Sequence, residues 1–249
     1  GNPGTTDWQA AYVMVARSAL LHSGTAARPV LQELFSSLDG LMSYFDRLVE
    51  PSGLLLAGAR GDWIPPSSIK VVTSQEIVAA FTHTLCVSYM ADIAAALGES
   101  SAAARYTARL RGNLAAFEAK FWNKGKSGGA PCCFDTGSMA SNVFALQLGA
   151  VGSAVRLNAT LDALVASFRD PPHLELGIFG TTYVFDVLRA HDLDDVGLAI
   201  LNESSYPSLG RMIAEGATTL WESWEGDRHH QVSSRNHIMF GGGVNRFLA

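Results

Sequence analysis

The chain has 249 residues, 48% of them hydrophobic, which is enough to bury a large core. The formal net charge is −5, whereas proteins that grip polyphosphate usually carry a basic surplus, so nucleic acid is not expected as a partner. No apolar run reaches the roughly 18 residues that a membrane helix needs, so a membrane is not expected either. The sequence leaves the cellular compartment open, because it shows neither a signal-peptide nor a transmembrane pattern.

The cysteines do not form a recognisable framework. There are three of them, Cys86, Cys132 and Cys133, and an odd count with one adjacent pair does not suit a set of disulfides. No Cys-x-x-Cys pair with zinc-ligand spacing occurs. We therefore expect neither a metal nor a cofactor, and we interpret Cys86 as a small buried hydrophobic residue.

Helical periodicity dominates the chain. Apolar residues between Leu31 and Leu48 step by three and four, and Pro29 suits the start of that helix. The same kind of spacing runs from Ile77 to Leu97, with Ser74 placed to cap this helix and Gly98 to end it. Further helices are expected near residues 8–22, 106–121, 138–149, 154–168, 181–191, 194–202 and 236–248.

The expected helices come in pairs. Short polar links join the members of a pair, as at residues 98–101 and 190–194. Longer loops rich in Gly, Pro and Trp join successive pairs, at residues 50–73, 123–137, 170–180 and 203–235. This rhythm predicts an all-α toroid of helical hairpins with its long loops on one rim, formed by residues 1–249 as a single domain. No fixed-length repeat is present, which argues against a solenoid.

Four of the five tryptophans lie in or beside the long loops or at the start of a helix: Trp8, Trp63, Trp221 and Trp224. Trp63 follows Asp62, and a flat ring beside a carboxylate suits sugar binding. The ring covers the apolar face of a pyranose, and the acid accepts hydrogen bonds from its hydroxyls. The alternative is that these rings only hold loops against the core.

The segment 216–227 contains three acids, Glu222, Glu225 and Asp227. Glycoside hydrolysis needs two carboxyl groups, one on each side of the scissile bond. Glu222 is the best catalytic candidate because Trp221 and Trp224 flank it and would position it away from water, whereas Glu225 and Asp227 are expected to face solvent. His237 follows closely, either as a buried hydrogen-bonding residue or as a contact to a sugar hydroxyl.

Five motifs in order resemble the α-L-rhamnosidases of glycoside hydrolase family 78. The most specific are Gly-Ala-Thr-Thr-Leu-Trp-Glu-Ser-Trp at 216–224 and Ser-Arg-Asn-His-Ile-Met-Phe-Gly at 234–241. The other three are the Gly-Asp-Trp loop at 61–66, Leu-Gly-Ile-Phe-Gly-Thr-Thr-Tyr at 176–183, and Tyr-Pro-Ser at 206–208 followed by Met212 and Ile213. The resemblance covers essentially the whole chain.

The resemblance implies an (α/α)6 barrel that releases rhamnose from rhamnose-containing glycosides with inversion. Glu222 matches the general base, which would deprotonate the attacking water. Trp63 and Trp8 match tryptophans that line the rhamnose subsite, and His237 matches a histidine that contacts the sugar. Asp62 either binds a hydroxyl or only holds its loop.

The family's general acid belongs to an Arg-Glu-Arg-x-Gly-Trp-x-Gly-Asp segment that does not occur in these 249 residues. Eight or nine helices are expected, short of the twelve of a complete barrel, so the sequence predicts a partial barrel without its N-terminal part. It is a fragment, a chain completed by another copy or chain, or a short relative without hydrolase activity. Exposed apolar helix faces would favour a homo-oligomer. Two other functions stay open, a non-catalytic sugar-binding or assembly relative and another six-hairpin glycosidase.

Overall fold

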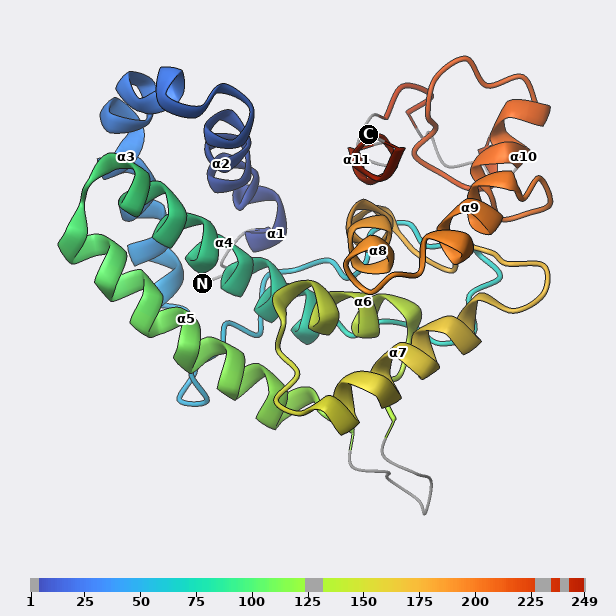
Figure 1. Cartoon of the computed structure of the whole chain (residues 1–249), viewed down its shortest axis with the longest axis horizontal. Helices are drawn as coiled ribbons and strands as arrows, with labels where there is room; N and C mark the ends of the chain where they lie inside the picture. Colours follow the sequence, from blue (N-terminus) through green and yellow to red (C-terminus); the bar gives the residue numbers. More distant parts are fainter. Residues whose placement is uncertain (1–4, 124–131, 227–233, 238–241, 249) are drawn as a thin grey trace. The chain divides into compact units, whose positions relative to one another are not determined.

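The computed structural model describes residues 5–123, 132–226, 234–237 and 242–248 (Figure 1). Across these residues every regular element is a helix, apart from one isolated antiparallel bridge between Trp122 and Phe134. The predicted all-α class is therefore confirmed. The chain divides into two compact units: unit 1 comprises residues 1–61 and 75–121, and unit 2 comprises residues 62–74 and 122–249. The prediction of a single domain stays a prediction.

Unit 1 is built around one central helix. Its elements are α1 (Thr6–Gln9), α2 (Ala11–Ser23), the 3₁₀ turn η1 (Gly24–Ala27), α3 (Arg28–Asp46), α4 (Gln75–Leu97) and α5 (Ser100–Phe121). Helix α4 packs against α1, α2, α3 and α5, and α5 lies alongside it (Figure 1). Because neighbours surround α4, every residue from Ile77 to Val87 is buried.

Helix α4 is also long and apolar enough to cross a membrane by length and composition, and it is the single helix in the described part of the chain that meets this test. Most of its apolar stretch is buried inside unit 1. A helix that is apolar all round is either a core helix or a membrane span. Its burial among four other helices explains its composition as that of a core helix.

The ends of α4 and α3 follow from their sequences. Gly98 adopts φ +84°, and the N–H groups of Gly98 and Glu99 donate to the carbonyls of Ala95 and Ala94, which is the Schellman arrangement. The predicted end of α4 is thus confirmed. In α3 the buried face consists of the apolar residues spaced by three, four and seven: Leu31, Leu38, Met42 and Phe45.

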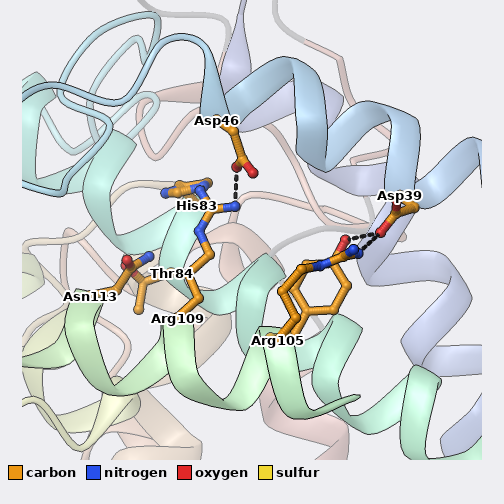
Figure 2. Close-up of polar contacts among 8 residues, drawn as sticks. Asp39, Asp46, His83, Thr84, Arg105, Arg109 and Asn113 are labelled. Carbon is orange, nitrogen blue, oxygen red and sulfur yellow. Dashed lines mark hydrogen bonds and ion pairs between the residues drawn. The ribbon is translucent and has the colours of Figure 1, made fainter. Parts of the chain in front are cut away.

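A row of polar side chains links α3, α4 and α5 (Figure 2). Arg109 of α5 pairs with Asp46 of α3, and its Nη2 lies 2.9 Å from Nε2 of His83 on α4. Arginine can only donate, so Nε2 of His83 accepts, and the single N–H proton of the neutral imidazole is on Nδ1. That Nδ1 has no hydrogen-bond partner among the described residues. Farther along the same helices, Arg105 pairs with Asp39.

Unit 2 contains α6 (Met139–Leu148), α7 (Ala154–Phe168), α8 (Ile178–Ala190), α9 (Asp194–Asn202), α10 (Leu209–Ala214) and α11 (Gly242–Leu248). Helix α8 packs against α6, α9 and α11. Three helices begin at a serine whose hydroxyl accepts the N–H three residues on: Ser138 for α6, Ser153 for α7 and Ser208 for α10. Short links connect α4 to α5 at residues 98–99 and α8 to α9 at residues 191–193, within the predicted links 98–101 and 190–194.

Three elements differ from the expected ones. Helix α1 is only four residues long and α10 only six, too short for a periodic apolar pattern to indicate them. The Ser208 cap starts α10, and Gly216, at φ +90°, ends it with the same Schellman bonds that end α4. The helix expected over 236–248 is described only as α11 from Gly242, and residues 236–237 are not helical.

Candidate active site

Asp62 lies at the N-terminus of α8 rather than on a surface. Its side chain is buried, its Oδ2 accepts the N–H of Gly177 at 2.7 Å, and its Oδ1 accepts the N–H of Gly180 at 2.9 Å. A helix N-terminus leaves its first N–H groups without intrahelical partners, and here a carboxylate from a loop 115 residues earlier satisfies them. Burial raises the pKa of Asp62 to about 6, against the lowering effect of backbone N–H groups including those of Gly180 and Gly177.

Glycine is required where this loop meets α8. A Cβ on Gly177 would lie 2.4 Å from the carbonyl oxygens of Asp62 and Trp63, and one on Gly180 would lie 2.9 Å from Oδ2 of Asp62. The N–H of Ile178 also donates to the carbonyl of Trp63 at 2.8 Å. The two glycines of the Leu-Gly-Ile-Phe-Gly motif therefore let the Asp62–Trp63 peptide pack directly against the start of α8. Of the two alternatives for Asp62, this geometry favours the holding of its loop.

Glu222 is held by hydrogen bonds to Ser234, which lies 12 residues later in the chain. Its N–H donates to the carbonyl of Ser234 at 2.8 Å, and its Oε2 accepts the N–H of Ser234 at 2.9 Å. The N–H of His237 donates to the carbonyl of Leu220 at 2.7 Å, so the backbone segments 220–222 and 234–237 lie side by side in antiparallel orientation. This pairing brings the imidazole and the carboxylate together, with Nε2 of His237 3.8 Å from Oε1 of Glu222.

Trp63 completes the surroundings of the carboxylate. Its indole Nε1 donates to Oε1 of Glu222 at 3.2 Å. The pKa of Glu222 is lowered by the backbone N–H of Ser234, then by the Trp63 indole and the nearby His237, while partial burial acts in the opposite sense. The side chain of Glu222 remains 20% exposed. A glutamate with a lowered pKa is ionised at neutral pH, which suits a group that takes up a proton rather than one that donates it.

The two tryptophans that flank Glu222 differ from each other. Trp224 is 2% exposed, and its Nε1 donates to the carbonyl of Leu176 at 2.7 Å. Its ring has no exposed face for a sugar, so we revise the expectation that it binds substrate and interpret it as an anchor for its turn. Trp221 is half-buried. Its ring lies so close to Gly226 that a Cβ there would come within 2.8 Å of it, and its ring centroid lies 5.9 Å from the guanidinium carbon of Arg235.

Trp8 belongs to unit 1, whereas the cluster above lies in unit 2. It is half-buried in α1, and its N–H donates to Oδ1 of Asp7 at 2.9 Å. Oδ2 of Asp7 accepts the N–H of Arg60 at 2.8 Å, so the buried Asp7 ties α1 to the end of the loop that precedes Asp62. The expected role of Trp8 as a wall of the sugar subsite stays a prediction.

Glu225 does not face solvent as the sequence led us to expect. It is half-buried, and its carboxylate accepts hydrogen bonds from the N–H of Ser67 at 2.6 Å, the hydroxyl of Tyr206 at 2.5 Å and the hydroxyl of Ser223 at 2.8 Å. No local signal could have found it, because two of the three donors lie 158 and 19 residues away in the chain. Asp227 lies outside the described residues.

A metal site is not formed by the residues that the structure describes: they contain no group of three or more His, Cys, Asp or Glu side chains able to hold an ion. Cys86 is fully buried on α4, in line with its interpretation as a small hydrophobic residue, and burial raises the pKa of its thiol to about 12.

The described part of the chain is thus an all-helical fold in which loop residues place an ionised glutamate beside an indole and an imidazole. The chain belongs to the bacterial alpha-L-rhamnosidase six-hairpin glycosidase domain family, whose model matches residues 2–249.

Individual relatives agree with this membership. An alpha-L-rhamnosidase of Streptomyces avermitilis is 29% identical over 247 residues, covering 96% of this chain and 22% of the relative. The structure of an alpha-L-rhamnosidase from Dictyoglumus thermophilum matches with a TM-score of 0.84 at 28% identity, over 98% of this chain and 27% of that one. The Streptomyces avermitilis enzyme complexed with L-rhamnose matches with a TM-score of 0.75 at 27% identity, over 89% and 21%.

The chain thus spans about a fifth to a quarter of the length of these relatives. The likeness supports the predicted fold class, an incomplete (α/α)6 toroid.

Proposed function

We propose that the chain is part of the catalytic domain of an inverting α-L-rhamnosidase and that Glu222 is its general base. The observation that carries this proposal is the carboxylate of Glu222, ionised and hydrogen-bonded to the Trp63 indole, with His237 3.8 Å away. The names of the relatives support rhamnose-containing glycosides as substrates, and one relative was solved in complex with L-rhamnose.

In this mechanism Glu222 takes a proton from water as the water oxygen attacks the anomeric carbon of the rhamnoside. The bond to the leaving-group oxygen breaks on the opposite face, and that oxygen takes a proton from a general acid or leaves as a stable anion. The product has the opposite anomeric configuration. Base and acid lie roughly 6.5–9.5 Å apart in inverting enzymes, which leaves room for the water. We propose that His237 and Trp63 contact the sugar while they hold Glu222.

The test uses the chain as it stands and an aryl α-L-rhamnoside whose phenol is acidic enough to leave without protonation. This substrate isolates the base, since it does not depend on the acid segment that the 249 residues lack. Glu222→Gln should reduce turnover by about 10²–10⁴-fold, the usual contribution of a general base. Glu215→Gln, a matched change in a glutamate that pairs with Arg211, should retain activity. Equal turnover by wild type and Glu222→Gln would remove Glu222 from the mechanism.

Two further measurements separate a base from a residue that only binds the sugar. Proton NMR of the first product should show the β anomer of rhamnose, because inversion of an α-linked substrate creates it; α-rhamnose as the first product would refute inversion. In Glu222→Ala, azide should restore turnover and yield a rhamnosyl azide, because this anion attacks without losing a proton. A binding residue would show no such rescue.

A non-catalytic sugar-binding or assembly role is the second candidate. It is favoured by the carboxylates of Asp62 and Glu225, which are both occupied by internal hydrogen-bond donors. Rhamnose binding by calorimetry without turnover of any aryl rhamnoside would support this role. Hydrolysis of a different glycoside in a panel, with rhamnosides untouched, would instead support another six-hairpin glycosidase.

Association with a second copy or a completing chain is proposed from exposed apolar residues on unit 1. Tyr12, Val15 and Leu21 of α2 are 37%, 67% and 64% exposed, and Val30 of α3 is 58% exposed. Tyr12 and Val15 are three residues apart and therefore neighbours on one side of α2, and contiguous exposed apolar surface marks interaction sites. A monodisperse monomer by light scattering at high concentration would refute self-association.

A further inference from the structure

The carboxylate of Glu225 joins three separate segments of unit 2. Its Oε1 accepts from the backbone N–H of Ser67 at 2.6 Å and from the hydroxyl of Tyr206 at 2.5 Å, and its Oε2 accepts from the hydroxyl of Ser223 at 2.8 Å. Hydrogen bonds to an ionised acceptor are shorter and roughly twice as strong as neutral ones. The loop after Asp62, the segment before α10 and the turn after Glu222 are therefore fastened at one point.

Two of these segments carry the residues of the proposed base. Ser67 follows Trp63 in one loop, and Glu225 follows Glu222 in the other. The bond from the Trp63 indole to Glu222 measures 3.2 Å, at the long end of the range for N–H···O bonds. Both loops are also anchored to the start of α8, through Trp63 and Trp224. The shorter contact of Glu225 with Ser67 adds a second direct bond between the two loops, a few residues away from the indole bond.

We propose that Glu225 is a positioning residue: its carboxylate holds the Trp63 loop against the Glu222 loop and so maintains the indole hydrogen bond on the base. The effect on turnover rests on the proposed function of Glu222, whereas the effect on the geometry of Trp63 and Glu222 does not.

The surroundings of Glu225 exclude a role as the second catalytic carboxyl group. Partial burial raises its pKa, but the bonds from the Tyr206 hydroxyl, the Ser67 N–H and the Ser223 hydroxyl outweigh that effect and lower the pKa to about 2. A carboxylate that is ionised at neutral pH has no proton to give to a leaving oxygen. Glu225 therefore does not replace the general acid of the segment that the sequence lacks.

The experiment observes the Trp63 indole directly, with no need for turnover. In the full chain labelled with ¹⁵N-tryptophan, the indole N–H signal of Trp63 is assigned by its loss in Trp63→Phe. Because this N–H donates to Glu222, its chemical shift should follow the ionisation of that carboxyl group in a pH titration. In wild type the midpoint should lie below the ordinary range of a glutamate, in line with the lowered pKa of Glu222.

Glu225→Gln should raise this midpoint, because a neutral amide holds the N–H of Ser67 and the hydroxyl of Tyr206 less firmly. Tyr206→Phe removes only one donor and should give a smaller shift in the same direction, so it tests the proposal if Glu225→Gln fails to fold. Glu215→Gln is the matched control and should leave the midpoint unchanged. A wild-type midpoint in both folded Glu225→Gln and Tyr206→Phe would overturn the proposal.

Turnover separates this proposal from the proposed function. If the aryl rhamnoside is hydrolysed, Glu225→Gln should lower kcat more than it raises KM, with the acid limb of the pH profile moved to higher pH as the NMR midpoint moves. If the chain hydrolyses nothing while the NMR midpoint still rises, the rhamnosidase function fails and the positioning role of Glu225 stands. Hydrolysis with an unmoved acid limb in Glu225→Gln would refute the positioning role alone.

Discussion

Lowering the pH should destabilise unit 1 through His83, the buried histidine of α4. Its side chain is 2% exposed, and its ring meets Phe45 edge to face with centroids 6.1 Å apart. Burial, together with the charge of Arg109, lowers the pKa of His83 from its ordinary 6.5 to about 3. Between these two values the unfolded chain holds a proton on His83 that the folded chain does not.

The size of the effect follows from this difference in pKa. Because the folded value is the lower one, stability is fully present above about pH 6.5 and falls as the pH drops towards 3. Each pH unit in that window costs up to about 1.4 kcal/mol per proton. Between pH 7.5 and 4.5 the contribution of His83 should therefore amount to a loss of about 3 kcal/mol in the free energy of unfolding.

The assay is chemical denaturation from pH 7.5 to 4.5, followed for wild type and for His83→Gln. Glutamine does not titrate here and can still accept from Arg109. The difference in stability between the two proteins should shift by about 3 kcal/mol in favour of the variant over this range. Other carboxylates titrate in both proteins, so only the difference is diagnostic. If the free energies of unfolding of wild type and His83→Gln fall in parallel as the pH is lowered, His83 is not a buried neutral histidine.

Three further predictions concern unit 2, and the second has a control variant in α3 of unit 1. The folded pKa of Asp62 is raised to about 6 from 3.8, so wild type should lose stability as the pH rises through this window, and Asp62→Asn should abolish that loss in denaturation curves. Gly177→Ala should destabilise by about 1–3 kcal/mol, because its Cβ would meet backbone oxygens at 2.4 Å. By contrast, Gly40→Ala, which meets nothing within 4 Å in α3, should stabilise by about 0.4–1 kcal/mol; a similar thermal shift for both would contradict the clash. Trp63→Phe should raise the pKa of Glu222 and move the acid limb of activity to higher pH; an unmoved limb would exclude the indole bond.

The helices could be predicted because their signals are local. The stepping of apolar residues and the positions of Ser and Gly at the ends depend only on neighbours a few residues away, and α4 therefore ends at the expected glycine. The same reasoning missed α10, since its six residues show less than two turns of periodicity. Its start and end depend on Ser208 and Gly216 alone.

The site was predictable in part. The motifs pointed to Glu222, Trp63 and His237, and the structure brings these three together in unit 2. Trp221 and Trp224 share the same short segment, and it is Trp224, bonded to the distant carbonyl of Leu176, that is buried. A sequence pattern gives the residue types near a carboxylate. It does not show which of these side chains are buried by, or hydrogen-bonded to, distant parts of the chain.

The position of Asp62 at the start of α8 makes the later turns of that helix relevant to Glu222. Helix α8 runs from Ile178 to Ala190, and Phe185 and Asp186 lie about 11 Å along it from its first residue. Its later turns are held by α11, through the ion pair of Arg246 with Asp186 and the ring contact of Phe185 with Phe247. A sideways shift of α8 at that distant contact would carry the 62–63 peptide with it. Mutational tests of the proposed function therefore have a second target, away from Glu222, in the packing between α8 and α11.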